Sequence, residues 1–327
     1  VETEPVITVE VAQDTTFLAV SNGEQLNMIG DVADVDVQPF EPKQRIFWSE
    51  CNSLVGWTDS ATVDGGTVAG TLKTDGYYFY SDNYGTGSQW HGPALKTSLS
   101  EALQDFSIEA IIDFRATDPK QVGRIVITAL DEMNQTVARM QFWRRNSYAK
   151  TNYALFSAGH GANQKTIFHD TGDQLSVWND FYGMLRIERI GNKWNVYVAQ
   201  IDRTTGKHHS RGGVRYWVDN DAVATNQIRQ ILVHVSTFSN YPACVQRIDD
   251  VKVYKINQQP ESIPIIAKAG DVIEFDHKNK IIRRNGEDIT KEKAFIGEYF
   301  KLNPGQNSIV VEPSAQNVEV RWREKWR

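Results

Sequence analysis

The C-terminal stretch from Gly270 to Arg327 reads GDVIEFDHKNKIIRRNGEDITKEKAFIGEYFKLNPGQNSIVVEPSAQNVEVRWREKWR. Short runs of alternating apolar and polar residues are separated by turn signals such as Asn285-Gly286, which is typical of consecutive β-strands. The pattern predicts two hairpins, with strands at residues 271–275, 280–284, 307–312 and 318–322. This stretch does not resemble a complete domain, so we expect its partner strands elsewhere in the chain.

The N-terminus supplies suitable partners. Alternation predicts three strands there, at residues 7–11, 16–20 and 25–29, and Asn22-Gly23 is a strong hairpin signal between the last two. Three strands cannot bury a core alone, whereas seven or eight form a self-sufficient sandwich. We therefore predict one discontinuous domain from residues 1–44 and 258–327, with Pro-marked joints at Pro39–Pro42 and Gln258–Ser262.

The middle region, residues 45–257, carries its own series of strands. At least nine are expected, and the clearest lie at residues 107–114, 124–130, 138–145, 184–190, 194–199, 228–235 and 248–256. Helix signal is poor, and only Leu99–Leu103 is expected to form a turn of helix. Antiparallel strands over this length favour a jelly-roll sandwich, and the lack of an internal repeat argues against a propeller. The predicted fold class is all-β, with two β-sandwiches, one inserted into the other.

Composition narrows the function. A chain of 327 residues with 40% hydrophobic content suits two packed domains. The net charge of -6 argues against binding to nucleic acid or to an anionic membrane, and no apolar run approaches the roughly 20 residues of a membrane span.

The start, VETEP, has no Met and no signal peptide, so we expect part of a longer protein. Cys51 and Cys244 show no metal-type spacing and are expected to be free thiols.

Aromatic residues gather in the middle region, where most of the nine tryptophans lie. Aromatic rings pack on the C–H faces of sugars, and Arg, Asn, Asp and Gln bind the hydroxyl groups. Any one tryptophan can equally belong to the core. Strand phase separates the two roles in residues 138–145, because alternate side chains point to opposite faces. Ala138, Met140 and Phe142 are predicted core, and the opposite face carries the candidate sugar-binding residues Arg139, Gln141, Trp143 and Arg145.

Two further aromatic groups are candidates. Trp90 and His91 lie in a Gly- and Pro-bounded loop, and Trp178 and Tyr182 lie at a predicted turn. Loops present functional groups on rigid scaffolds, although such rings also plug the ends of sandwiches. Trp194 shares the phase of its apolar neighbours and is predicted core.

Catalysis has weak support. Sandwich glycosidases of the laminarinase type carry a Glu-x-Asp-x-Glu strand that places two carboxylates on one face, and this sequence has none. Asp249-Asp250 is a candidate for a structural Ca²⁺, whereas a solvated strand edge is the commoner role of such a pair. We expect no enzyme activity and no cofactor.

The two ends of the chain resemble the C-terminal, galectin-like domain of siphophage distal tail proteins. The residues that carry this resemblance are Pro5–Val9, Phe17–Gly23, Gly270–Phe275, Asn285-Gly286, Tyr299–Asn307 and Val318–Trp326. The middle resembles the carbohydrate-binding module of the "evolved" members of that family, a concanavalin/laminin-G-like jelly roll. It does so at Gly56–Thr58, Trp90–Pro93, Phe106–Ala110 and Ile248–Val253.

The resemblance implies a structural protein of the virion tail tip, assembled in the bacterial cytoplasm and acting at the host cell surface. Its expected partners are host cell-wall polysaccharide and other tail and baseplate proteins. The family's ring-forming belt domain has no counterpart here. A homohexamer is therefore expected for the full-length parent, and a monomer for this fragment. The alternatives are a glycosidase or depolymerase on the same jelly roll, and a purely structural spacer of the baseplate.

Overall fold

The computed structural model describes residues 1–32, 39–144, 151–171, 177–258 and 262–324. The chain separates into two compact units. The terminal unit contains Val1–Pro42, Arg203–His208 and Asn257–Arg327, and the inserted unit contains Lys43–Asp202 and His209–Ile256.

The terminal unit is a small β-sandwich. Its elements are β1 (Val6–Val11), β2 (Phe17–Ser21), β3 (Leu26–Gly30), β21 (Val272–Asp276), β22 (Ile281–Arg284), β23 (Glu287–Asp288), the 3₁₀ turn η2 (Thr290–Glu292), β24 (Val310–Glu312) and β25 (Ala315–Arg321). They form a five-stranded sheet in the order β23-β22-β21-β1-β25 and a three-stranded sheet in the order β24-β2-β3.

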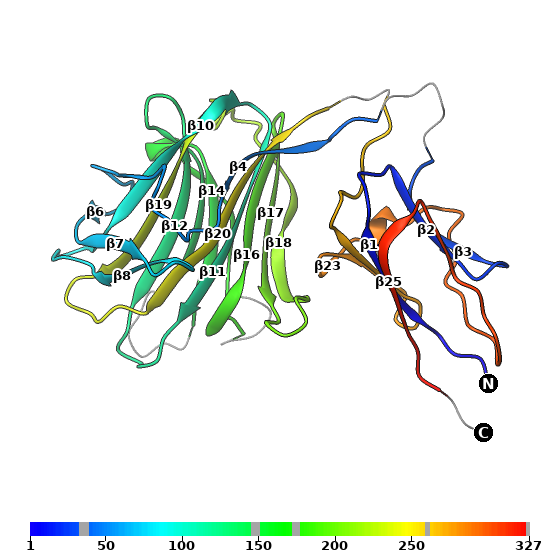
Figure 1. The fold of residues 1–327 in the computed structure, drawn as a ribbon. Coiled ribbons are helices and arrows are strands. Elements are labelled where there is room, and N and C mark those ends of the chain that lie inside the picture. Colours follow the sequence, from blue (N-terminus) through cyan, green and yellow to red (C-terminus); the bar gives the residue numbers. More distant parts are fainter. Residues whose placement is uncertain (33–38, 145–150, 172–176, 259–261, 325–327) are drawn as a thin grey trace. The chain divides into compact units, whose positions relative to one another are not determined.

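Segments from both ends of the sequence share one sheet in this unit (Figure 1). β1 lies between β21 and β25 and pairs antiparallel with both, so that Val9 is opposite Ile273 on one side and Val318 on the other. Alternate residues of β1 point inward, and Ile7 and Val9 are fully buried in the core. The period-two pattern of the N-terminal sequence therefore corresponds to one buried face.

One predicted pairing is wrong. Residues 307–312 and 318–322 were expected to form a hairpin, but β24 pairs with β2 and β25 pairs with β1. Pro313 lies between the two strands and has no N–H to donate to a ladder. The chain crosses there from one sheet to the other, so the two strands belong to different sheets instead of lying side by side.

The inserted unit consists of two large antiparallel sheets. Its elements are β4 (Lys43–Ser49), β5 (Thr58–Asp59), β6 (Thr67–Val68), β7 (Thr71–Thr74), β8 (Phe79–Asn83), β9 (Trp90–Gly92), β10 (Ala94–Leu103), β11 (Phe106–Arg115), β12 (Gly123–Leu130), β13 (Thr136–Arg144), β14 (Tyr153–Ala158), the 3₁₀ turn η1 (Gly161–Asn163), β15 (Lys165–Asp170), β16 (Asp180–Ile190), β17 (Lys193–Ile201), β18 (His208–Val218), β19 (Ile228–Phe238) and β20 (Val245–Ile256).

The nine-stranded sheet has the order β15-β14-β13-β12-β19-β10-β5, with β9 and β6 added beside β19. The eight-stranded sheet has the order β18-β17-β16-β11-β20-β8-β7, with β4 on β20. One apolar core fills the space between the two sheets, and it includes Phe114, Phe142 and Trp194. The predicted all-β class with jelly-roll-like sandwiches is confirmed, and so is the core position of Trp194.

The expected helical turn at Leu99–Leu103 is wrong, because these residues end strand β10. Leu99 and Leu103 are both buried, which fits a period of two as well as a period of four. The short run could not distinguish the two periods, and pairing of β10 with β19 decides for the strand.

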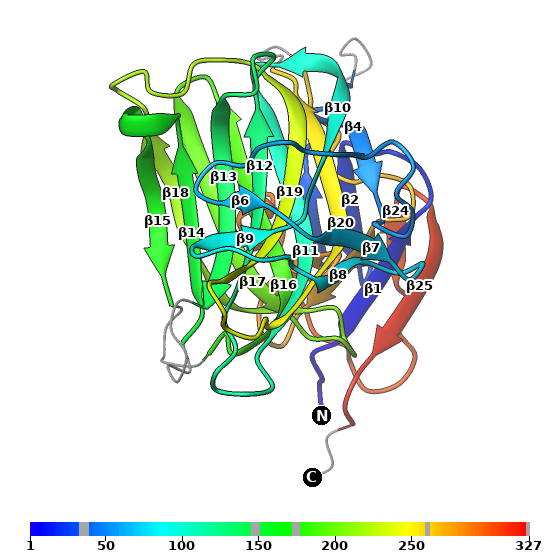
Figure 2. The same ribbon diagram turned by 90° about the vertical axis from the view of Figure 1, so that its left-hand side faces the viewer.

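Part of the chain crosses the outer face of the nine-stranded sheet. Figure 2 shows the segment that carries β6 and β9 running in front of β12, β13 and β19. β9 pairs with the end of β19, and β6 runs parallel to β9. We call residues 60–68, which end in β6, the crossing segment. Together with β9 it covers some of the side chains that point outward from the sheet.

Both cysteines are free and buried. Among the described residues, no helix has the length and apolar character needed to cross a bilayer.

Candidate functional site

Polar and aromatic side chains occupy the outer face of the nine-stranded sheet. Arg124 on β12, Trp143 on β13 and Tyr153 on β14 lie directly opposite one another in neighbouring strands. Their sequence neighbours Ile125 and Phe142 point the other way, into the core. We call the group Trp90, Arg124, Arg139, Gln141, Trp143 and Tyr153 the arginine–tryptophan face.

The rings on this face form a continuous strip. Trp143 lies 6.0 Å from Trp90 and 6.0 Å from Tyr153, measured between ring centroids. Tyr153 lies in turn 5.5 Å from the ring of His169, which is exposed. Trp90, Trp143 and Tyr153 are half-buried, so part of each ring faces solvent. A strip of partly exposed rings offers stacking area to a flat apolar ligand surface.

Two arginines lie beside the strip. Arg139 forms an ion pair with Asp64, which comes from the crossing segment. Arg124 donates from Nη2 to the carbonyl oxygen of Gly65 at 2.9 Å and from Nε to Ser236 Oγ at 3.3 Å. Its guanidinium also lies 4.7 Å from the centre of the Trp90 ring, a cation–π contact.

Glycines allow the crossing segment to approach the arginines closely. A Cβ atom on Gly66 would lie 2.9 Å from Nη2 of Arg124 and 3.0 Å from the carbonyl oxygen of Trp90. Gly65 has a φ of +73°, in the left-handed region that favours glycine. The backbone at these two positions therefore rests directly against the arginine–tryptophan face.

His234 lies beneath the same segment. It is 1% exposed, and its Nε2 atom has no hydrogen-bond partner among the described residues. Burial and the charge of Arg124 lower the pKa of His234 to about 3, so the ring is neutral at pH 7. Burial and the charge of Arg139 lower the pKa of Arg124 to about 9, and this guanidinium stays charged.

A polar cavity of about 290 Å³ adjoins Asp64. Its lining is rich in polar groups, and three of the lining side chains are aliphatic. The lining residues are Ser60, Thr62, Val63, Asp64, Thr128, Leu130, Asn134, Thr136, His160 and Leu232. Sequence reasoning missed this cavity, because its residues come from separate loops and strands and share no motif. The crossing segment and η1 bring them together only in the fold.

The structure brings four predicted site residues together: Trp90, Arg139, Gln141 and Trp143. It also changes their expected surroundings. Arg139 and Gln141 are only 8% and 6% exposed, whereas the sequence predicted an open row. The crossing segment causes this difference, because Asp64 and its neighbours cover the middle of the face. Arg145 lies outside the described residues.

Three other candidates lie elsewhere. Trp178 is 1% exposed, packs against Phe142 and donates from Nε1 to the Ser210 carbonyl oxygen at 2.9 Å, so it belongs to the core. Tyr182 is on β16 of the other sheet and donates its hydroxyl to Asp249. His91 is buried, with Nδ1 2.8 Å from the Gln89 carbonyl oxygen. The burial of Trp178 and His91 speaks against a binding role for either, because a turn or loop position alone does not show which way a ring points. A binding role for Tyr182, which is half-buried, stays a prediction.

The candidate calcium ligands have other contacts. Asp249 accepts a hydrogen bond from Tyr182, and Asp250 accepts one from Nε1 of Trp48 at 2.7 Å. In the described part of the chain, no three His, Cys, Asp or Glu side chains are placed to hold a metal ion. A calcium site stays a prediction that these contacts do not support.

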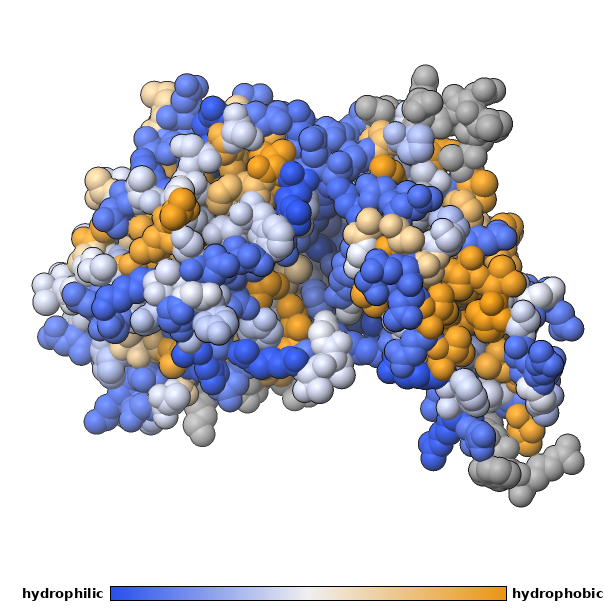
Figure 3. All heavy atoms as spheres, viewed as in Figure 1, coloured by the Kyte–Doolittle hydropathy of each residue, from blue (hydrophilic) through white to orange (hydrophobic). Residues whose placement is uncertain are grey.

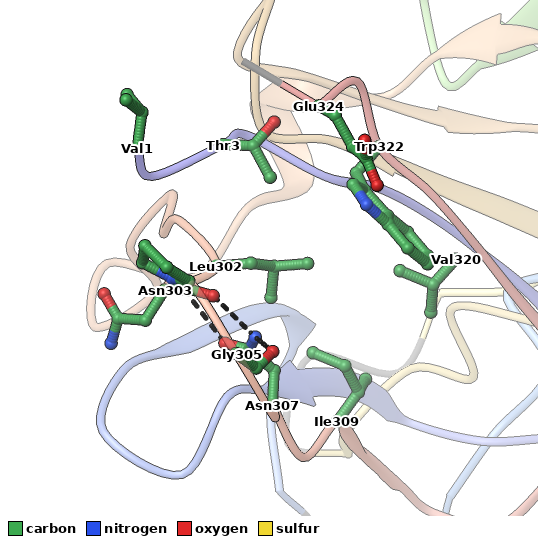
Figure 4. Close-up of a pocket in the computed structure, with 11 residues that line it drawn as sticks. Val1, Thr3, Leu302, Asn303, Gly305, Asn307, Ile309, Val320, Trp322 and Glu324 are labelled. Carbon is green, nitrogen blue, oxygen red and sulfur yellow. Dashed lines mark hydrogen bonds between the residues drawn. The ribbon is translucent and has the colours of Figure 1, made fainter. Parts of the chain in front are cut away.

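The terminal unit has a cavity of a different character, about 630 Å³ in volume. Figure 4 shows Leu302, Ile309, Val320 and Trp322 around it, with the loop that Asn307 closes by hydrogen bonds to Asn303 and Gly305. Hydrophobic residues gather on the visible face of this unit in Figure 3. The walls are mainly apolar, so this cavity suits an apolar side chain better than a hydroxylated ligand.

Comparison with known families gives a match in the C-terminal third of the chain. Residues 236–326 match the model of the siphovirus-type tail component, C-terminal domain. The resemblance to siphophage tail proteins is confirmed. The matched range begins in β19 of the inserted unit and continues through β25, so the tail-component sequence pattern includes the strand that leads back into the terminal unit. No curated protein matches the chain.

Solved structures resemble the jelly roll in fold. The CBM2 module of the evolved distal tail protein of Lactobacillus casei BL23 phage J-1 is 14% identical, with a TM-score of 0.56, and the match covers 67% of this chain and 98% of that module. A family 16 endo-glucanase from Bacteroides ovatus is 11% identical, with a TM-score of 0.44, over 64% of this chain and 99% of that enzyme. The first match shows a shared fold, and the second is too distant to carry an argument about activity.

Proposed function

We propose that this chain is a virion tail-tip component whose inserted unit binds host cell-wall saccharides without catalysis. The proposal assigns residues 1–44 and 258–327 to the tail-protein domain and residues 45–257 to the carbohydrate-binding module. The family match supports the tail role, and the fold shared with a carbohydrate-binding module of an evolved distal tail protein supports the binding role.

The observation that carries the binding role is the combination of partly exposed rings with unsatisfied polar atoms. Trp143 Nε1, Arg139 Nε and His234 Nε2 are buried and have no hydrogen-bond partner among the described residues. Buried polar atoms are nearly always paired in folded proteins, so three orphans on one face indicate a missing partner, either solvent or ligand. A sugar supplies hydroxyl groups for such atoms and a C–H face for the adjoining rings.

The dimensions of the face suit an oligosaccharide. Trp143 and Thr136 stand at opposite ends of β13 and border the aromatic strip and the polar cavity, respectively. At about 3.3 Å per residue they are roughly 23 Å apart. A saccharide of several residues can therefore contact rings at one end and hydroxyl and amide groups at the other.

Weak binding at one site becomes effective when several copies are displayed together. The family resemblance implies a homohexamer of the full-length parent, which would present six inserted units on one tail. Linking sites in this way raises avidity by orders of magnitude without any new contact. The terminal unit is the part that would contact other baseplate proteins.

The experiment is a binding assay of the full chain on purified wall polysaccharides from siphophage host bacteria. Trp143→Ala and Trp90→Ala should each weaken binding at least about fivefold, if stacking of a sugar on the ring is worth the roughly 1–3 kcal/mol that a stacked nucleic-acid base contributes. Trp48→Ala is the matched control, because Trp48 is an exposed tryptophan on β4 of the other sheet. Equal effects of all three substitutions, or no binding to any polysaccharide, would contradict the proposal, and release of reducing ends would favour an enzyme.

A further inference from the structure

Two buried guanidinium groups converge on one point of the arginine–tryptophan face. Arg124 and Arg139 are only 5% and 8% exposed. A Cβ atom built on Gly65 would lie 3.9 Å from the Nη1 atom of each. The same point of the crossing segment therefore touches both cations.

The charges at this point do not balance. Asp64 is paired with Arg139. The contacts of Arg124 are a hydroxyl group, a carbonyl oxygen and the ring of Trp90, none of which carries a charge. His234 is neutral, for the reason given above. Two positive charges thus share one carboxylate, and burial makes an unbalanced charge costly.

Hydrogen-bonding capacity is also left over at the same place. Nε of Arg139 and Nε2 of His234 are buried and have no partner among the described residues. Both residues are more than nine-tenths buried, so they are not surface groups that point at random into solvent. A guanidinium with a free edge binds carboxylate or phosphate oxygens with two parallel hydrogen bonds.

We propose that the saccharide bound by this face carries an acidic group, a carboxylate or a phosphodiester, which binds Arg124 and Arg139 in the position that Asp64 now occupies. The proposal rests on the proposed saccharide-binding function and specifies the class of saccharide. Asp64 is the internal stand-in for the ligand anion. Its side chain is 39% exposed, whereas that of Arg139 is 10% exposed, so the carboxylate can turn toward water while the guanidinium stays in place.

A structural role for Asp64 predicts the opposite effect of mutation. If Asp64 only anchors the crossing segment, then Asp64→Asn loosens the site and weakens binding. If Asp64 competes with the ligand, Asp64→Asn removes the competitor and raises the local positive charge. Asp64→Asn should then strengthen binding about tenfold, and more at low salt, because screening weakens the attraction of separated charges.

The test uses the full chain and the purified wall polysaccharide that it binds in the assay above. One portion is treated with carbodiimide and an amine, which neutralises carboxylates, and another with hydrofluoric acid, which cleaves phosphodiesters. We expect Asp64→Asn to strengthen binding to the untreated polysaccharide, Arg139→Gln to weaken it at least about tenfold, and one of the two treatments to abolish both effects. The effective treatment identifies the acidic group. Asp82→Asn is the control, since Asp82 forms an exposed ion pair with Lys73 elsewhere in the same unit.

The outcomes separate the two proposals. Failure to bind any wall polysaccharide refutes the saccharide-binding function and this inference with it. Full binding after both treatments, or weaker binding by Asp64→Asn, overturns the acidic ligand alone. If Arg139→Gln does not fold, as judged by its thermal unfolding, Asp64→Asn and the two treatments still decide the question.

Discussion

Trp178→Ala and Trp143→Ala should have opposite consequences for stability and binding. Trp178 is buried between Phe142 and Phe181 and donates a hydrogen bond to Ser210. A fully buried Trp side chain removes about 200 Å² from water, worth about 5 kcal/mol at 25 cal/mol per Å², and measured Trp→Ala losses are about 3–5 kcal/mol. We expect Trp178→Ala to lower the free energy of unfolding by about 4 kcal/mol.

Trp143 is half-buried, and its Nε1 atom has no partner among the described residues. Its removal should cost less than that of Trp178, about 3 kcal/mol, since part of the ring stays in contact with solvent in the native chain. Urea unfolding followed by circular dichroism measures both losses. In a thermal scan a unit of this size loses about 2–4 °C per kcal/mol, so Trp178→Ala should lower the midpoint by about 10 °C.

The binding assay completes the comparison. Trp143→Ala should bind wall polysaccharide poorly while remaining folded at 25 °C. Trp178→Ala, measured at a temperature where it is folded, should bind as the wild type does. Equal stability losses for the two variants would refute the reasoning, and so would loss of binding by Trp178→Ala at a temperature where that variant is folded.

Two further predictions concern buried titratable groups. Burial lowers the pKa of His277 to about 4, so the unfolded chain, with a pKa near 6.5, takes up the proton first. Stability should therefore fall as pH drops from about 6.5 to 4, by about 3 kcal/mol for this residue, and urea unfolding of His277→Gln should lack that part of the decline. Burial raises the pKa of Cys244 to about 12 and that of Cys51 still further above its usual range. Neither thiol should react with iodoacetamide at pH 8 in the native chain, whereas both should be alkylated in urea; labelling of the native chain, measured by mass, would contradict their burial.

Local patterns in the sequence predicted most of the strands and their buried faces. The phase of residues 138–145 placed Ala138, Met140 and Phe142 in the core, and all three are buried. Asn22-Gly23 predicted the hairpin of β2 and β3, which pair in the structure. These features depend on neighbouring residues, and a period of two in the sequence translates directly into two faces of a strand.

Features that depend on distant segments could not be predicted in this way. Asp64 lies in the loop between β5 and β6 and covers Arg139, and nothing near Arg139 in the sequence shows this. Trp178 has a polar turn sequence around it, yet its ring fills the core from that turn. The polar cavity beside Asp64 likewise forms from residues far apart in the chain. The same holds at Pro313, where the chain passes from one sheet to the other because β24 pairs with β2 and β25 with β1.

Hydrogen–deuterium exchange of the full chain, with and without bound wall polysaccharide, tests the location of the site most directly. The account predicts slower exchange in β13, β14 and the segment from Ser60 to Gly66, with β16, β17 and the terminal unit unchanged. Protection confined to the terminal unit or to the eight-stranded sheet, in a sample shown to be saturated, would contradict it.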